Sequence, residues 1–153
     1  MRKCLALAVV AAWCCHVGGA WAHSHKQKGL EIVHPWCFAT GDAAAKTAAV
    51  YMLIKNRTKR PDRLIGATSP SAQSVELRGP AASPGGGMQA ATGVALKGRH
   101  EVALKRDGPH FVVSGLAAPL APYDSFPMTL IFKRAGKIEI EVVVEEAVEP
   151  AKQ

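Results

Sequence analysis

Apolar residues along this 153-residue chain fall into short runs that are separated by Gly, Pro, Asp and Ser. In the last of these runs, alternate residues from Ile138 to Val144 are apolar, which places them on one face of a strand. A turn at residues 134–137 separates this run from the one before it, so the two are predicted to form a hairpin. Strands are predicted at residues 30–36, 48–55, 63–67, 74–78, 101–104, 111–114, 128–133 and 138–144.

Short strands with this punctuation predict an all-β fold, a sandwich or a barrel, in one domain. Residues 42–46 allow one helical turn, and no stretch has a sustained helical period. Residues 79–87, reading GPAASPGGG, predict a flexible loop of the kind that carries function when a rigid scaffold holds both ends. We also expect residues 23–28, reading HSHKQK, to be an exposed and mobile N-terminus, and residues 147–153 to be a frayed polar tail.

The first 22 residues have the layout of a secretory signal peptide. Basic residues 2–3 precede an apolar stretch over residues 5–15, and Ala20-Trp21-Ala22 is a small-x-small cleavage site. The stretch is shorter than the ~20 residues of a membrane span. An uncut membrane anchor and a lipoprotein are the alternatives, although Trp13 is poorly suited to precede a lipidated cysteine. The expectation is a periplasmic protein with no stable membrane span after cleavage.

The chain is basic, with a formal net charge of +7. Loss of Arg2 and Lys3 with the signal peptide lowers this charge to +5. The basic residues are scattered along the sequence and do not interleave with aromatic residues, and export removes the protein from nucleic acid. We therefore predict no nucleic-acid partner and interpret the charge as solubility with weak attraction to anionic surfaces.

Cysteine use and the spacing of polar residues argue against catalysis. Three of the four cysteines lie in the signal peptide, so the processed chain keeps Cys37 alone and forms no internal disulfide. Cys37 stands between Trp36 and Phe38, which predicts a buried, inert thiol rather than a reactive one. No Ser-His or paired-carboxylate spacing suggests an active site. The protein is not expected to be an enzyme.

A series of phrases, in a fixed order, gives the chain a family likeness. The phrases are HPWCFAT, AAAKTAAVYMLIKN, DRLIGATSPSAQSVEL, the Gly/Pro loop ending at Met88, GRHEVALKRDGPHFVVSGL and PMTLIFKRAGKIEIEV. With these phrases, the chain resembles the periplasmic copper chaperones called PCuAC over roughly residues 29–146. The resemblance implies a cupredoxin-like or immunoglobulin-like β-sandwich that binds Cu(I) at its surface. It also implies delivery towards the dinuclear copper centre of cytochrome oxidase.

The same resemblance implies a copper site with half of its usual ligands. The family uses two His and two Met, and here Met88 and His110 fall at two of those positions. Arg78 stands where the first His is expected, and Val112 where the final Met is expected. Thioether and imidazole suit soft Cu(I), whereas the fixed charge of Arg78 opposes a cation. Met88 with His110 would be a labile copper site; the alternative is a packed loop Met and a surface His.

A second candidate copper site lies at the processed N-terminus. Cleavage after Ala22 would leave His23-Ser24-His25 with a free α-amine. A His at the third position binds Cu(II) through the amine, two deprotonated amides and its ring, which is the square-planar nitrogen set that Cu(II) prefers. The alternative is a processing remnant in which His23 and His25 are incidental.

Two hypotheses of function follow. The first is a copper-binding chaperone or storage protein that hands its metal by ligand exchange to a copper-accepting protein, such as a cytochrome oxidase subunit or its assembly factor. The second is a binding module on the same sandwich that has lost copper and uses Arg78 to hold an anionic ligand. Of the remaining candidates, His34 is expected to be structural and His100 to be exposed. Met52 and Met128 lie within predicted strands and are expected to be core.

Overall fold

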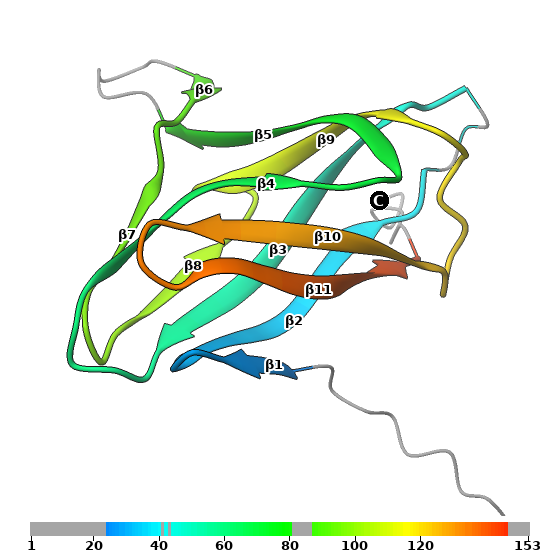
Figure 1. Ribbon diagram of the computed structural model, residues 1–153. Helices are drawn as coiled ribbons and strands as arrows, with labels where there is room; N and C mark the ends of the chain where they lie inside the picture. The colour runs from blue at the N-terminus through cyan, green and yellow to red at the C-terminus, as the bar shows by residue number, and fades with distance from the viewer. Residues whose placement is uncertain (1–23, 41, 43, 81–86, 147–153) are drawn as a thin grey trace, which may run out of the picture.

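The computed structural model describes residues 24–40, 42, 44–80 and 87–146. The predicted signal peptide, His23, most of the Gly/Pro loop and the polar tail lie outside the described residues. Within them every regular element is a strand (Figure 1), and no helix is long and apolar enough to cross a membrane. The strands are β1 (Ser24–Gln27), β2 (Leu30–Phe38), β3 (Thr47–Asn56), β4 (Asp62–Thr68), β5 (Ala72–Pro80), β6 (Met88–Ala90), β7 (Val94–Leu96), β8 (Glu101–Leu104), β9 (His110–Leu116), β10 (Ser125–Phe132) and β11 (Gly136–Glu145).

The strands form one continuous path, β6-β5-β9-β3-β2-β11-β10-β4-β7, with β1 paired to β2 and β8 paired to β3. Almost all pairs are antiparallel, and β2 runs parallel to β11. Because β4 also lies against β5, the path folds back on itself and gives two packed layers (Figure 1). The predicted hairpin is β10–β11, with Leu130 opposite Ile138.

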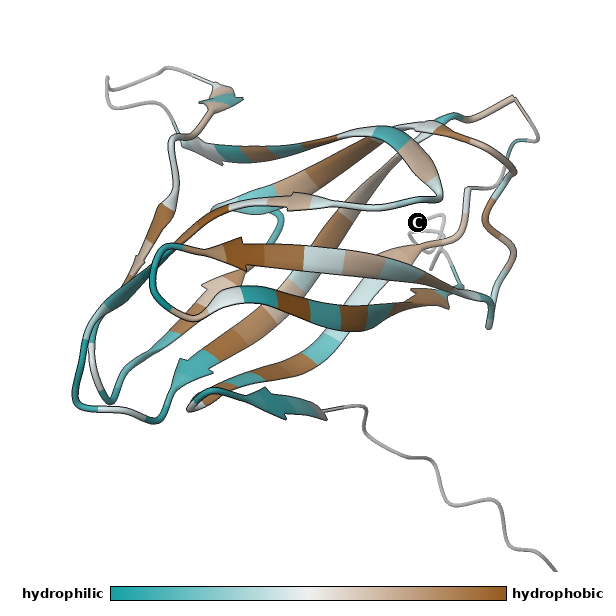
Figure 2. Ribbon diagram, in the orientation of Figure 1, coloured by the Kyte–Doolittle hydropathy of each residue, from teal (hydrophilic) through white to brown (hydrophobic). Residues whose placement is uncertain are grey.

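The core lies between the layers and follows the predicted alternation (Figure 2). Phe111 and Val113 of β9 are fully buried, while the residues between and beside them face outward. Met52 and Met128 are buried, as the sequence predicts. The most deeply buried large side chains are Phe111, Phe132, Ile32, Ile54, Leu64, Leu96, Met128, Leu130 and Ile138.

The N-terminal segment differs from expectation. Residues 24–27 were expected to be mobile, but they form β1 and pair with residues 30–33 of β2. The connection is the two-residue turn Lys28-Gly29, in which both residues have positive φ, as a type I′ hairpin requires. A Cβ at Gly29 would collide with the side chain of Thr58, so glycine is required there. The turn lacks the Asn-Gly or Asp-Gly signature, which is why the pattern did not reveal it.

The structure also contains two short strands and a β-bulge that the sequence pattern does not predict. β6 and β7 are three residues each, too short to give a period-2 pattern. Near the predicted helical turn, the Ala45 amide donates a hydrogen bond to the Asp42 carbonyl. β2 contains a bulge between Val33 and Trp36, with His34 at a positive φ of 49°. After the bulge, Cys37 points inward and its two aromatic neighbours point outward.

Candidate functional site

Strand register gathers the four positions singled out by the sequence on one outer face. Arg78 of β5 is the cross-strand partner of His110 on β9 and of Ala90 on β6. Cross-strand partners share a face, and so do residues two apart on one strand. Met88 therefore lies on the same face as Ala90, and Val112 on the same face as His110.

His110 is oriented by a local hydrogen bond. Its Nδ1 lies 3.0 Å from the carbonyl oxygen of Gly108. A carbonyl accepts but does not donate, so Nδ1 carries the proton and Nε2 keeps its lone pair. Metal-binding histidines are commonly held in this way, with the second ring nitrogen donating to a backbone carbonyl. The half-buried ring of His110 is thus in the tautomer that a metal needs.

Met88 lies two strands away from His110. It is half-buried and is opposite Pro80 in the β5–β6 pairing. From the usual spacing of strands and residues, the Cα atoms of Met88 and His110 are about 12 Å apart. At that distance the two side chains would have to extend towards each other over β5 for one ion to bridge them. The strand between them presents Arg78 at this point.

The charge of Arg78 is partly neutralised by a carboxylate on the same strand. Its Nη2 donates to the Glu76 carboxylate at 3.1 Å, and the two side chains are 43% and 53% exposed. The Nε of Arg78 is buried and has no hydrogen-bond partner among the described residues. Glu76 in turn is opposite Val112. The face therefore offers two donors for a soft metal, one cation with its counter-ion, and one unpaired N–H.

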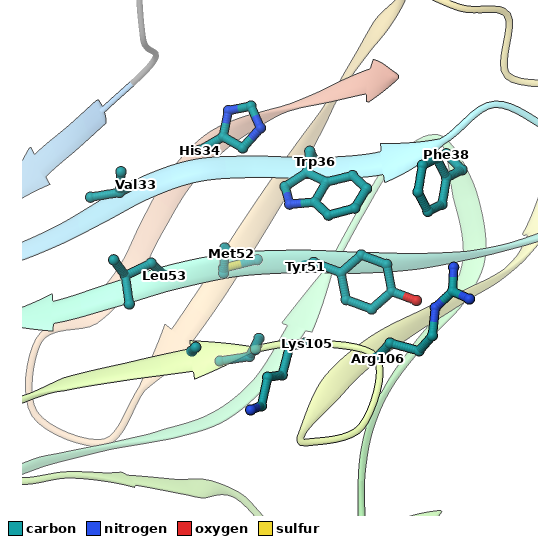
Figure 3. A pocket seen from close by; sticks show the side chains of 11 residues that line it. Val33, His34, Trp36, Phe38, Tyr51, Met52, Leu53, Lys105 and Arg106 are labelled. Atoms are coloured by element: carbon teal, nitrogen blue, oxygen red, sulfur yellow. The ribbon is translucent and has the colours of Figure 1, made fainter. Parts of the chain in front are cut away.

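A row of aromatic rings extends from His110 across the neighbouring strands. The ring centroid of Tyr51 on β3 is 5.8 Å from that of His110, and Trp36 on β2 is 5.0 Å beyond Tyr51. Phe38 packs edge-on against Trp36 at 4.9 Å, and the guanidinium of Arg106 lies 5.9 Å from the Phe38 ring centre. An open groove of about 410 Å³ is lined in part by Trp36, Phe38, Tyr51 and Arg106, and His110 lies outside it (Figure 3).

The other predicted site residues are not part of this face. His25 lies in β1, where its Nε2 accepts a long hydrogen bond of 3.4 Å from the Glu141 amide. His34 is hydrogen-bonded through its Nε2 to Oε1 of Glu145 at 2.7 Å. His100 is exposed and donates from Nδ1 to the Gly98 carbonyl. No three His, Cys, Asp or Glu side chains come together as a metal site within the described residues.

Cys37 is buried, as the sequence predicts, and it is unpaired. Loss of solvent around the thiol raises its pKa from 9.0 to about 12, with a further contribution from the negative charge of Glu145. The thiol therefore stays protonated and unreactive at neutral pH.

Sequence reasoning overlooked Glu76 and Tyr51. The signal for Glu76 was its position two residues before Arg78, which puts both on one face of a strand. The signal for Tyr51 was weaker, because it sits in an apolar run that is predicted as core throughout. Only the register of β3 against β9 brings its ring to His110.

Comparison with known proteins identifies relatives of this fold. A family model with the description "Putative lipoprotein LpqE-like" matches residues 30–144. The apo PCuAC domain from PmoF1 is 25% identical, with a TM-score of 0.72 over 82% of this chain and 100% of that one. The copper-bound PCuAC domain from PmoF2 is 29% identical, with a TM-score of 0.69 over 82% and 99%.

A structure of lower sequence identity has the same fold. The Cu(I) form of DR1885 from Deinococcus radiodurans is 24% identical, with a TM-score of 0.62 over 85% of each chain, and shows the shared fold. No match was found among curated proteins. The predicted all-β sandwich and the PCuAC resemblance are both confirmed by these comparisons.

Proposed function

The chain belongs to the LpqE-like family, and from that premise we propose that it is an exported copper-binding protein of the chaperone type. It would hold Cu(I) between the Nε2 of His110 and the thioether of Met88, and release it to an acceptor protein. The observation that carries the proposal is the hydrogen bond from His110 to the Gly108 carbonyl, which leaves Nε2 free on the face of Met88. The copper-bound state of the related PmoF2 domain supports copper as the cargo.

The donor set suits a carrier more than a store. His and Met are ligands for soft Cu(I), and neither is lost to disulfide formation in an oxidising compartment. Two donors leave the metal accessible, so acceptor ligands can join before the carrier ligands depart. The nearby Arg78 cation weakens binding, and its ion pair with Glu76 limits that weakening. Cu(I) would then transfer to an acceptor protein that supplies more ligands and binds the ion more tightly.

The protein would act in the periplasm and deliver its copper to another protein there. The signal-peptide pattern and a family description that refers to a lipoprotein support export to the periplasm. The acceptor would be a copper-accepting protein of that compartment, with a cytochrome oxidase subunit or its assembly factor as the first candidate on the PCuAC likeness.

Copper titration of the exported, processed protein tests the proposal. Cu(I) is titrated under reducing conditions in competition with a chromophoric chelator, with Met88→Ala and His110→Ala alongside the unchanged protein. Met52→Ala is the matched control, since it removes a buried thioether on the central strand β3. We expect both site variants to lose Cu(I) binding and the control to keep it. Equal Cu(I) affinity in His110→Ala and the unchanged protein would rule out this site.

A second function is favoured by one observation, the buried Nε of Arg78 that lacks a partner. An acceptor group on an anionic ligand would satisfy it and make the protein a binding module without copper. On this alternative the unchanged protein binds no copper, and Arg78→His with Val112→Met creates copper binding anew. Copper binding by the unchanged protein that matches the double variant would rule the alternative out.

A further inference from the structure

Most lysines and arginines of the described chain gather at one end of the sandwich, although they are scattered along the sequence. They come from β1, from the loops after β1, β3, β7 and β10, and from adjacent strand ends. These loops lie together at the lower left of Figure 1, where Figure 2 shows a concentration of polar residues. This basic end comprises Lys26, Lys28, Lys55, Arg57, Lys59, Arg60, Arg63, Lys97, Arg99, Lys133, Arg134 and Lys137.

The loops of the basic end are held to one another by hydrogen bonds. The Arg99 amide donates to the Thr58 carbonyl at 2.7 Å, which ties the loop before β8 to the one before β4. Lys28 donates from Nζ to the Ala135 carbonyl at 2.7 Å and ties the first turn to the last. The first bond joins two backbone atoms and the second joins a side chain to a backbone carbonyl, so the loops form one connected frame that presents the charges.

The few acids at this end already have partners, which leaves the positive charge unbalanced. Glu31 pairs with Lys26 and Arg57. Asp62 accepts the amide hydrogens of Arg134 and Ala135 at 2.8 and 2.9 Å, and Glu101 pairs with Lys55. At this end, the exposed cations with neither an ion pair nor a side-chain hydrogen bond among the described residues are Lys59, Arg60, Lys97, Arg99, Lys133 and Lys137.

The chemistry of the basic end selects among anionic partners. Protein interfaces are commonly centred on aromatic anchors, and single-stranded nucleic acid is bound by aromatic stacking. The basic loops expose no Phe, Tyr or Trp within the described residues. The aromatic groove lies instead on the outer face of β2, β3 and β8. Charges spread over several loop tips match a plane of lipid headgroups, where each Lys or Arg adds to attraction.

We propose that the basic end binds the surface of a bilayer that contains anionic phospholipids. The family description refers to a lipoprotein, and a lipid-anchored chain lies at a membrane surface, which agrees with this proposal. Attachment is peripheral and reversible, since the attraction is electrostatic and is screened by salt. The inference does not depend on copper, because none of the basic-end residues belongs to the face of Met88 and His110.

Co-sedimentation with vesicles tests the proposal, using the exported, processed protein without copper. Vesicles of phosphatidylcholine alone are compared with vesicles that also contain phosphatidylglycerol, at low and high salt. The variant Lys59→Glu with Lys97→Glu changes the basic end. Lys46→Glu with Lys105→Glu is the matched control, with the same change in net charge elsewhere.

We expect binding to the anionic vesicles alone, lost at high salt. The basic-end variant should reduce the partition coefficient by at least about tenfold, and the control by much less. Equal losses in the two variants would overturn the proposal, as would binding to neutral vesicles. Equally tight, salt-sensitive binding to a DNA duplex would also overturn it, by showing a response to any polyanion. Copper titration of the basic-end variant separates the two functions, because its Cu(I) affinity should be unchanged.

Discussion

Arg78 on β5 and His110 on β9 are directly opposite each other as cross-strand partners, on the same outer face of the sandwich. A cation therefore stands beside the imidazole that offers its free nitrogen to a metal. The PCuAC likeness implies a histidine at the position of Arg78. This one pair determines whether the face is a copper site of reduced affinity or a site for something else.

Replacing the cation should strengthen copper binding. In Arg78→His, a repulsive charge is removed and a third donor is added, so we expect Cu(I) affinity to rise by at least about tenfold, or about 1.4 kcal/mol. Val112→Met in addition should raise it further. Chelator competition measures both, with Lys46→His as a control for an added surface His. Glu76→Gln should act in the opposite direction, because it removes the counter-ion at 3.1 Å from Arg78. An unchanged affinity in Arg78→His would contradict this account.

Adjacent residues on β9 should have separate effects. Phe111 is fully buried, whereas His110 is half-buried on the outer face. Phe111→Ala should lower the free energy of unfolding by about 3–5 kcal/mol, and His110→Ala should lower it by less than about 1 kcal/mol. Urea unfolding measures both changes. A large loss in His110→Ala would mean that the ring is a structural element rather than a ligand.

Trp36 should report copper at His110. Trp13 and Trp21 belong to the predicted signal peptide, so Trp36 is the one tryptophan of the processed chain. Its ring is 5.0 Å from Tyr51, which is 5.8 Å from His110. We expect copper to quench its emission in the unchanged protein and to leave it unaffected in His110→Ala. Quenching that survives in His110→Ala would move the metal to another position.

The sequence predicts the sandwich well because its strands are long enough to show their period. Alternation in residues 138–144 and the turn before them identify the β10–β11 hairpin without other information. Elements of three residues carry no such pattern, so β6 and β7 appear only when the neighbouring strands are in place. β1 depends on a two-residue turn whose Lys28 is an unusual choice at positive φ.

Only part of the candidate site can be predicted from the sequence. Met88 and His110 are identifiable by residue type and family likeness, since soft donors are chemically distinctive. The contributions of Glu76, Tyr51 and Gly108 depend on strand register, which links residues far apart in the chain. The basic end is the same case, because charges that are scattered in sequence converge through four loops.

Cys37 should make stability depend on alkaline pH. Its pKa is raised to about 12 in the folded state by burial and by Glu145, against 9.0 for an ordinary thiol. The folded state thus keeps its proton where the unfolded state loses it. The contribution is complete below pH 9 and is lost as the pH rises towards 12, at up to about 1.4 kcal/mol per unit. Cys37→Ala should flatten this slope in urea unfolding measured across that range. Identical slopes in the two proteins would contradict the prediction.

Copper binding at the processed N-terminus should compete with β1. The Cu(II) set predicted from the sequence needs the α-amine, the amide nitrogens of residues 24 and 25, and the ring of His25. His23 lies outside the described residues, but residues 24 and 25 pair with Val33 and Ile32 in the sheet, and His25 Nε2 accepts from Glu141. A chelate that takes over these amides has to unpair the start of the strand. We therefore expect the protein to bind Cu(II) at least about tenfold more weakly than the free peptide HSHKQK, a cost of about 1 kcal/mol or more for the lost pairing.

Competition with a Cu(II) chelator measures both affinities, and amide hydrogen exchange in residues 26–33 should become faster when Cu(II) binds. His25→Ala keeps the backbone of β1 but removes the chelate, so it should abolish both effects. Equal affinities of protein and peptide, with exchange in β1 unchanged by Cu(II), would mean that strand and chelate do not compete.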